Sequence, residues 1–329
     1  MKIVRPAVLL LAAPLALAAL LGATAGHAET YPTRPVTVIV PFAGGSASDV
    51  VTRVVLDHMG NALGQRFVIE NRPGAGGNIG TAAAARAAPD GYTLVMGASG
   101  PFAANRSLFK ELGYDPEKDF EPIGLFAHFP NIVVASAKLP VKSVAELVAY
   151  AKRRPGELNY GSVGVGSSQH LAGVFFEQVT GVQLTHVPYR NIGQYGPDLM
   201  AGTVPLGFQW YPNVSAPIQG GGARALAVAS TKRLDALPDV PTSAEAGIPT
   251  YIASGWIALL APRGTPKPIV DKLHAALAAA MADPTIRARC EQLGAHPEAS
   301  TPEDLMTFIV SETVKWAEIT QRGNVPMAQ

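Results

Sequence analysis

Hydrophobic positions in the first third of the chain alternate between two periods. Runs rich in β-branched residues favour strands, and between them apolar residues recur every three or four positions, which favours helices. The order strand, helix, strand, helix, strand is typical of βαβ units with a parallel sheet. The five segments are residues 36–42, 49–64, 66–72, 78–91 and 92–99.

The same alternation returns after Phe129 and continues to about Thr250. Two α/β sets of similar size predict two similar lobes. The strands of the second set are expected at 131–136, 158–163, 185–189, 204–210 and 223–230, and its helices at 143–156, 167–181 and 194–202.

The C-terminal part follows a different pattern. A strand-like run at 255–262 precedes two long helices. The first covers 266–294 and breaks at Asp283-Pro284, because proline favours the first turn of a new helix. The second begins with Thr301 as its N-cap and Pro302 at the first helical position. We expect these helices to pack on the first lobe, so that lobe 1 comprises 29–128 and 251–329 and lobe 2 comprises 129–250.

Composition adds little to this picture but limits the partners. The chain has 329 residues, of which 48% are hydrophobic and 16% charged, and this length favours two domains. With 26 basic and 25 acidic residues, the net charge is +1. No overall field favours nucleic acid, so any anion must be held locally. The lone cysteine, Cys290, excludes an internal disulfide or a two-cysteine motif and lies on an apolar helix stripe.

The N-terminus has the organisation of a secretory signal. Lys2 and Arg5 form a charged start, residues 7–21 are apolar, and residues 26–28 form a small-x-small cleavage site. We expect cleavage after Ala28 and a periplasmic location. The alternative is a retained membrane anchor, since the apolar run is near the lower limit for spanning a bilayer.

The small-residue loop from Phe42 to Ser48 joins a buried strand to a helix expected to begin near Asp49. Small residues let a ligand approach the backbone, and a helix N-terminus offers unpaired N–H groups to an anion. A carboxylate or phosphate fits there without any lysine or arginine. Taken alone, the loop is more typical of a tight turn in which Ser48 caps the helix and Asp49 complements its dipole.

A second loop, residues 159–173, has the same organisation in the other lobe. Because ligands of open α/β sheets bind at the carboxyl ends of strands, two facing lobes would place both loops in one cleft. A ligand with two anionic ends would then bridge them.

Other familiar chemistry is missing from the sequence. In the third glycine cluster, residues 74–80, Ile79 takes the third glycine position of a dinucleotide fingerprint, so the cluster serves as a turn. No loop ends in Gly-Lys-Ser/Thr, and Ser167 and Ser168 lack the context of a nucleophile elbow. No histidines stand at metal-ligand spacing. We therefore expect no cofactor and no metal.

Many ordered stretches make the whole mature chain resemble the receptors of tripartite tricarboxylate transporters, the Bug family. They include "YPTRPVTVIVPFAGGSASDVVTR", "LGQRFVIENRPGAGGNIGT", "APDGYTLVMG", "LNYGSVGVGSSQHLAG", "HVPYR", "LPDVPTSAEAG" and "APRGTPKPIVDKL". The resemblance implies a type II periplasmic-binding-protein fold of two α/β lobes that close on a small carboxylate, without catalysis.

By matched position, the resemblance also implies ligand contacts. From the first loop come Phe42, Ala43, Gly44, Gly45, Ser46 and Ser48, and from the second Ser162, Gly164, Ser167 and Ser168. Ser99 and Asn105 are further candidates.

Two departures from the family pattern bear on the ligand. The first loop has Gly44 where the family usually has proline. Gln209 stands where members commonly carry an aspartate that meets the ammonium group of amino acids. We predict that this chain does not select an α-amino acid, because a desolvated ammonium would lack a charged partner.

Aromatic residues near Gln209 suggest an apolar end of the cleft. Trp210 and Tyr211, with Phe42, Phe102 and Phe129 nearby, would make that end flat and suit an aromatic carboxylate or a dicarboxylate. Ordinary core packing of these rings is the equal alternative.

The sequence therefore predicts a monomeric receptor that captures a small organic carboxylate and delivers it to membrane permease subunits. One rival is an exported α/β hydrolase that uses Ser167 or Ser168. Another is a ligand sensor that presents the carboxylate to a signalling partner.

Overall fold

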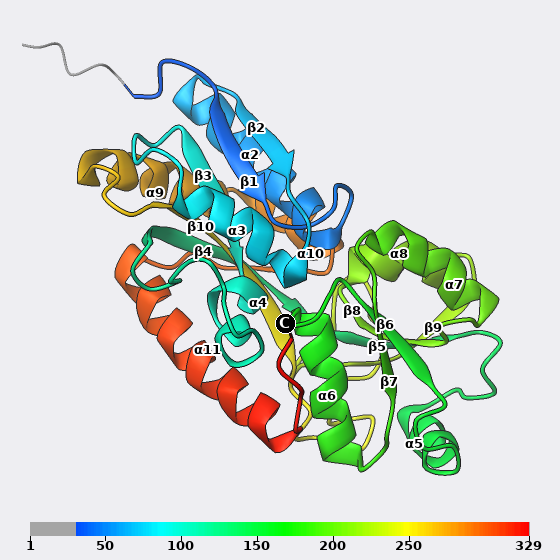
Figure 1. Cartoon of the computed structure of the whole chain (residues 1–329). Helices are drawn as coiled ribbons and strands as arrows, with labels where there is room; N and C mark the ends of the chain where they lie inside the picture. The colour runs from blue at the N-terminus through cyan, green and yellow to red at the C-terminus, as the bar shows by residue number, and fades with distance from the viewer. Residues whose placement is uncertain (1–30, 329) are drawn as a thin grey trace, which may run out of the picture.

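The computed structural model describes residues 31–328, and the predicted signal segment lies outside them. This part of the chain forms two α/β lobes, each built on its own sheet (Figure 1). The predicted two-lobed fold is confirmed. No helix within residues 31–328 is long and apolar enough to cross a membrane.

The sheet of lobe 1 has six strands, and its N-terminal part is parallel as predicted. The strand β1 (Val36–Val40) pairs in parallel with its two neighbours, whereas the strands from later in the chain pair antiparallel. In spatial order the strands are β11 (His296–Pro297), β4 (Phe120–Pro130), β10 (Ser254–Pro262), β3 (Thr93–Ala98), β1 and β2 (Phe67–Asn71).

Helices cover both faces of this sheet, because its central strands are apolar on both sides. Val38 and Val40 of β1 belong to the core on one face, and Ile39 belongs to the core on the other. The helices of the lobe are α2 (Ala47–Leu63), α3 (Asn78–Ala85), α4 (Ser99–Phe102), α9 (Lys267–Ala282), α10 (Pro284–Gln292) and α11 (Pro302–Arg322), with short 3₁₀ turns η1 (Ala75–Gly77) and η2 (Ala104–Ser107).

Lobe 2 contains a five-stranded sheet with its own core. The strand β6 (Asn159–Ser162) pairs in parallel with both neighbours. The spatial order is β7 (Thr185–Pro188), β6, β8 (Leu206–Gln209), β5 (Ile132–Ser136) and β9 (Ala223–Val228). The helices are α5 (Val144–Lys152), α6 (Ser168–Thr180), α7 (Tyr195–Ala201) and α8 (Tyr211–Gln219), with a 3₁₀ turn η3 (Ile192–Gln194).

The C-terminal helices pack on lobe 1, as predicted. Both α9 and α11 contact β4, and α11 runs along the outside of the lobe (Figure 1). Asp283 caps α10 after the predicted break, and Thr301 caps α11 with Pro302 in its first turn. Cys290 is fully buried in the core of lobe 1, as its place on an apolar stripe indicated.

Two of the longer elements were missed because prolines disguise them. The strand β4 has the sequence FEPIGLFAHFP, in which Pro122 and Gly124 interrupt the strand pattern. The helix α8 has Pro212 in its first turn and Pro217 inside, and an internal proline argues against a helix.

The chain crosses between the sheets twice, and the crossings lie side by side. Asn131, between β4 and β5, donates hydrogen bonds to the carbonyl of Ala253 from its backbone amide at 2.9 Å and from Nδ2 at 3.2 Å. Ala253 directly precedes β10. Paired crossings of this kind are where a hinge between lobes would bend. The exact lobe limits given above stay a prediction.

Candidate functional site

The first loop leaves β1 at Val40 and enters α2 at Ala47. Ser46 caps the helix, since its backbone is extended (φ −67°, ψ 161°) and its Oγ accepts a hydrogen bond from the amide of Asp49 at 3.4 Å. The predicted cap at Ser48 and the helix start near Asp49 were wrong by two residues. Gly45, at φ +77°, makes the left-handed turn that brings the helix start forward.

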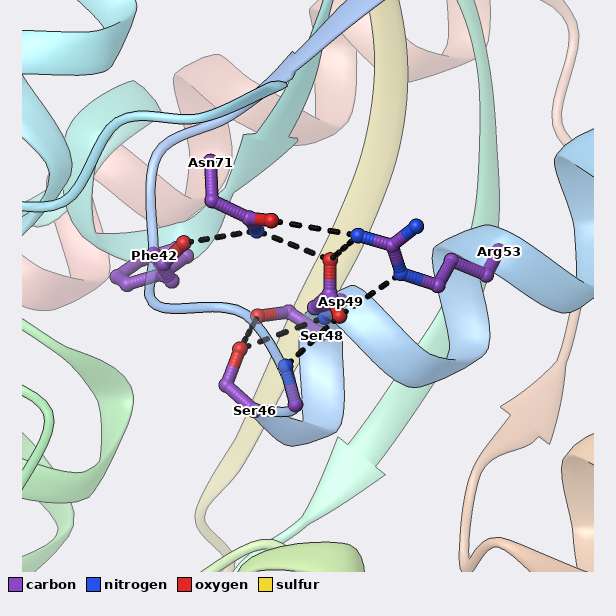
Figure 2. A network of polar contacts seen from close by, with 7 residues as sticks. Phe42, Ser46, Ser48, Asp49, Arg53 and Asn71 are labelled. Atoms are coloured by element: carbon purple, nitrogen blue, oxygen red, sulfur yellow. Dashed lines mark hydrogen bonds and ion pairs between the residues drawn. The ribbon is translucent and has the colours of Figure 1, made fainter. Parts of the chain in front are cut away.

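Asp49 anchors this loop from behind (Figure 2). Its carboxylate accepts hydrogen bonds from the amide of Gly45 at 2.8 Å, from Asn71 Nδ2 at 2.9 Å and from Arg53 Nη2 at 2.9 Å. Burial alone would raise the pKa of Asp49, but the hydrogen bonds from Arg53 and Asn71 outweigh it and lower that pKa below its usual value. The carboxylate is therefore charged and engaged within lobe 1.

A matching loop in lobe 2 leaves β6 at Ser162 and enters α6 at Ser168. Ser167 caps α6: its Oγ accepts from the amide of His170 at 3.3 Å and donates to the carbonyl of Gly164 at 2.7 Å. Ser162 lies behind the loop, where its Oγ contacts His186 Nε2 at 2.6 Å. Both lobes therefore present a serine-capped helix N-terminus.

The starts of α2 and α6 line one pocket between the lobes, which we call the donor pocket. It is lined by five buried serines, Ser46, Ser48, Ser99, Ser167 and Ser168, and by Phe42, Ala47, Gly100, Val163, Gln169, Trp210 and Asn213. None of these residues carries a charge. The free space is about 10 Å³, room for about one water molecule. The two lobes are thus closed around this pocket.

Backbone amides at both helix starts are available to an acceptor in this pocket. Within residues 31–328, the amides of Ser48, Ser168 and Gln169 donate no hydrogen bond. Such first-turn amides carry partial positive charge and favour anions. The arrangement can therefore hold a carboxylate by neutral donors alone.

A chain of hydrogen bonds crosses the cleft beside these amides. Gln209 Nε2 donates to the carbonyl of Gly161 at 2.8 Å, Asn213 Nδ2 donates to Gln209 Oε1 at 3.0 Å, and the amide of Ala47 donates to Asn213 Oδ1 at 3.0 Å. Each amide side chain is oriented by its donor and its acceptor. The chain links β6 of lobe 2 to the start of α2 in lobe 1. Gln209 is fully buried and acts behind the pocket, by positioning Asn213.

The aromatic residues around Trp210 divide between pocket and core. Trp210 stacks on Phe129, with ring centroids 4.3 Å apart and an interplanar angle of 11°. Its ring lines the donor pocket, and its buried Nε1 has no hydrogen-bond partner within the described chain. Tyr211 and Phe102 line neither this pocket nor the cavity beside it. Core packing therefore accounts for most of these rings.

The cavity beside the donor pocket, which we call the annex, has a volume of about 490 Å³. The third glycine cluster forms one of its walls, although the sequence indicated only a turn there. Gly76, at φ +61°, lies so close to lobe 2 that an added Cβ would be 2.1 Å from the carbonyl oxygen of Val165. Close approach to another backbone, rather than a nucleotide motif, explains these glycines.

The sequence of the chain matches that of a known protein family. Residues 51–325 match the family model described as "Tripartite tricarboxylate transporter family receptor". The chain belongs to this receptor family. The resemblance inferred from the sequence is confirmed.

Individual members of the receptor family are similar over nearly their whole length. Protein BugT of Bordetella pertussis is 37% identical over 305 residues, which cover 91% of this chain and 94% of BugT. The structure of R. palustris Rpa4515 with adipate is 37% identical, with a TM-score of 0.88, and covers 91% of this chain and 100% of that one. MatC from Rhodopseudomonas palustris, with bound malate, is 35% identical with a TM-score of 0.82 and covers 88% and 99%.

The cleft of this receptor brings together most of the predicted site residues. Phe42, Ser46, Ser48, Ser99, Ser167, Ser168 and Trp210 line the donor pocket, Ala43 and Gly164 line the annex, and Gly44 lines an outer cavity. Gly45, Asn105, Ser162 and Gln209 line none of these three cavities. The amide of Gly45 is bonded to Asp49, and Asn105 Nδ2 donates to Asn78 Oδ1 at 2.5 Å.

Sequence reasoning missed Asn213 and Gly76. Asn213 lies on the helix that its prolines disguised, and its partner Ala47 is 166 positions away. Gly76 had a signal, a glycine cluster directly before a helix, but that pattern predicts only a turn. Contacts between lobes leave no local pattern in a sequence.

Two histidines lie under the second loop of the receptor. His170 and His186 have ring centroids 4.1 Å apart, and burial lowers the pKa of His170 to about 4 and that of His186 to about 3. Both imidazoles are therefore neutral at neutral pH. The amide of Gly166 donates to His170 Nδ1 at 3.2 Å, so this ring supports the loop. No cluster of metal-ligating side chains occurs in the described part of the chain.

Proposed function

We propose that this receptor captures a small organic carboxylate in the periplasm and delivers it to the membrane permease subunits of a tripartite tricarboxylate transporter. The carboxylate is held between the starts of α2 and α6. The observation that carries this proposal is the donor pocket, in which two helix N-termini from separate lobes converge among five buried serines.

Neutral donors suit a protein that must also release its ligand. An anion held by N–H and O–H groups from both lobes loses half of its partners when the lobes separate. Since such a ligand contacts both lobes only in the closed form, its binding shifts the population toward closure. The relatives that bind adipate and malate support the carboxylate assignment.

The donor pocket also argues against an α-amino acid as the ligand. No aspartate or glutamate lines it, Gln209 is neutral and already bonded at both ends, and Asp49 is engaged behind the first loop. Burial of an ammonium group here would therefore be unfavourable, because no charged partner would offset the free energy lost on desolvation.

A hydrolase that uses Ser167 or Ser168 has less support. The hydroxyl of Ser167 bonds the carbonyl of Gly164, and that of Ser168 bonds Gln169 Oε1 at 3.3 Å, so neither is bonded to an imidazole that would remove its proton. We propose that the protein is not an enzyme. Product from a panel of esters that disappears in Ser168→Ala would contradict this.

The proposal also covers signal cleavage and oligomeric state. The signal segment is cleaved after Ala28, which mass spectrometry of the exported protein tests. The mature receptor is a monomer, which light scattering tests. A sensory role is the rival to transport. Loss of carboxylate uptake on deletion of the receptor, at unchanged transcription of carboxylate-responsive genes, supports transport, and the reverse supports sensing.

The direct test is a thermal-shift screen followed by calorimetry. The panel contains terephthalate, benzoate, citrate and aspartate. A carboxylate without an ammonium group should raise the melting temperature in proportion to the logarithm of its excess over Kd. Tightest binding of aspartate would contradict the proposed selectivity, and no binding by any carboxylate would contradict the proposed function.

A further inference from the structure

A third connection joins the lobes, apart from the two crossings of the chain. It lies at the C-terminal end of α11, where Gln178 of α6 in lobe 2 donates a hydrogen bond from Nε2 to the carbonyl of Ile319 at 2.8 Å. Gly323, directly after α11, lies so close to α6 that an added Cβ would be 2.6 Å from Cγ1 of Val174. The end of this long helix of lobe 1 therefore contacts lobe 2 directly.

The residues after α11 return from this contact to lobe 1. Asn324 makes a left-handed turn at φ +47°, and the amide of Ala328 donates to the carbonyl of Leu108 at 2.6 Å. Ala328 also forms a parallel bridge with Phe109, which follows η2. In Figure 1 this segment runs, in red, from the end of α11 beside α6 toward α4. We call the end of α11 and the residues that follow it, 319–328, the strap.

The strap packs on a hydrophobic cluster that both lobes share. Leu171 of α6 is 1% exposed and belongs to the same cluster as Trp316 of α11. Ile319, Val325 and Ala328 of the strap pack against this cluster. Apolar surface that is buried between the lobes returns to water when they separate, so this packing stabilises the closed form.

The strap differs from the two crossings because its contact with lobe 2 is not covalent. Asn131 and Ala253 belong to continuous backbone, which can bend but cannot come apart. The strap meets α6 through one side-chain hydrogen bond and a small apolar surface. Interactions of this size break and form again easily, so the contact can open with the lobes.

We propose that the strap holds the lobes together: its contacts with α6 form when the lobes close, and they must break before a bound ligand leaves. The strap sets the rate of release rather than the choice of ligand, since none of residues 319–328 lines the donor pocket. The inference rests on the proposed capture and release of a carboxylate and adds what limits the release.

Two variants at the contact test its effect on release. Gln178→Glu keeps the shape of the side chain, but a carboxylate cannot donate to the carbonyl of Ile319. Gly323→Ala adds a Cβ that meets Val174, and at φ −80° it does not strain its own backbone. Each variant should raise the rate of ligand release at least about fivefold. Gln321→Glu adds the same charge to an exposed residue at the same helix end and should leave the rate unchanged.

Release is measured by rapid filtration after dilution of the receptor loaded with labelled terephthalate, benzoate or citrate, whichever binds most tightly. Circular dichroism confirms that each variant is folded. The association rate should change less than the release rate, because the strap does not touch α6 while the lobes are open. Release in both variants within about twofold of the unmodified receptor, or slower release, would overturn the inference.

A reversible cross-link tests the same contact in the opposite direction. Val174→Cys combined with Gly323→Cys brings two thiols within reach of a disulfide, and the one native cysteine, Cys290, is fully buried. Oxidation of the loaded receptor should slow release at least about tenfold, and reduction should restore it. Failure of the cross-link to form, or equal release rates before and after reduction, would show that the contact does not restrain the lobes.

These outcomes separate the strap from the proposed function. If one of the three acids binds and its release is the same in every variant, only the role of the strap fails. If none of the three acids binds, the proposed function and the inference that rests on it both fail.

Discussion

Replacing Asn213 by Asp would place a negative charge at the start of α2 with almost no change in side-chain shape. Oδ1 of Asn213 is 3.0 Å from the amide nitrogen of Ala47, so the new carboxylate would lie beside the position proposed for the ligand carboxylate. It would also lose the hydrogen bond to Gln209 Oε1, because a carboxylate cannot donate.

The magnitude follows from the short distance. Two unit charges about 4 Å apart interact by about 4 kcal/mol at an effective dielectric constant of about 20. If solvent halves this repulsion, about 2 kcal/mol remains, so the expected loss of affinity is between about 30-fold and about 1,000-fold. Asn213→Ala removes the same hydrogen bond to Gln209 and also the one between the lobes, but it adds no charge. The bond between the lobes is worth about 1 kcal/mol, so this variant should weaken binding about fivefold.

Calorimetry of both variants against the tightest carboxylate measures the difference, and circular dichroism confirms that each variant is folded. The reasoning requires Asn213→Asp to bind at least about sixfold more weakly than Asn213→Ala. Equal affinities for the two variants would show that no anion binds near the start of α2.

Three further predictions concern the lobes and the core. Gly76→Ala should weaken ligand binding at least tenfold, because its Cβ would lie 2.1 Å from the carbonyl oxygen of Val165 when the lobes are closed. Gly247→Ala is the control, since Gly247 also has a positive φ but an added Cβ would have nothing within 4 Å, and it should not weaken binding. Equal effects of the two variants would show that a clash between the lobes is not the cause. The free energy of unfolding, measured in urea, should fall as pH drops from about 6.5 through 4, because histidines bind protons in the unfolded chain while the buried His170 and His186 stay neutral. The lowered pKa of His170, about 4, alone accounts for roughly 3 kcal/mol of this loss. His170→Gln should make the pH dependence weaker. Burial raises the pKa of the Cys290 thiol to about 11, so a thiol reagent at pH 8 should react only after unfolding, and rapid native labelling would contradict its burial.

Local patterns were enough to predict most of the fold. The runs that became β1, β3 and β10 are apolar at nearly every position, and the starts of α10 and α11 carry cap residues directly before a proline. These signals are contained within a few residues. The strand β4 and the helix α8 failed because proline and glycine obscured their pattern, while burial of the whole segment against other elements stabilises them.

The site was predictable only in part, for a physical reason. A small-residue loop before a helix indicates an anion-binding helix start, and this signal pointed to Ser46, Ser48, Ser167 and Ser168. The sequence did not show that the amide of Gly45 donates a hydrogen bond to Asp49, or that Gln209 acts by positioning Asn213. Those contacts depend on how one helix start meets another lobe, and no spacing along the chain encodes that.

The aromatic residues show the same limit. The sequence left open whether Trp210 and Phe129 form an apolar end of the cleft or pack in the core. The two rings stack on each other, and the annex is lined by Ile79 and Ile192. Composition indicates that rings are available, whereas packing decides which surface they cover.

The most direct test of the account is amide NMR of the receptor during titration with its tightest carboxylate. An anion held by both helix starts should shift the amide resonances of Ser48 on α2 and of Ser168 and Gln169 on α6 together, with one common Kd. Shifts at only one helix start, or at neither while binding is measured by calorimetry, would contradict a carboxylate held between the two lobes.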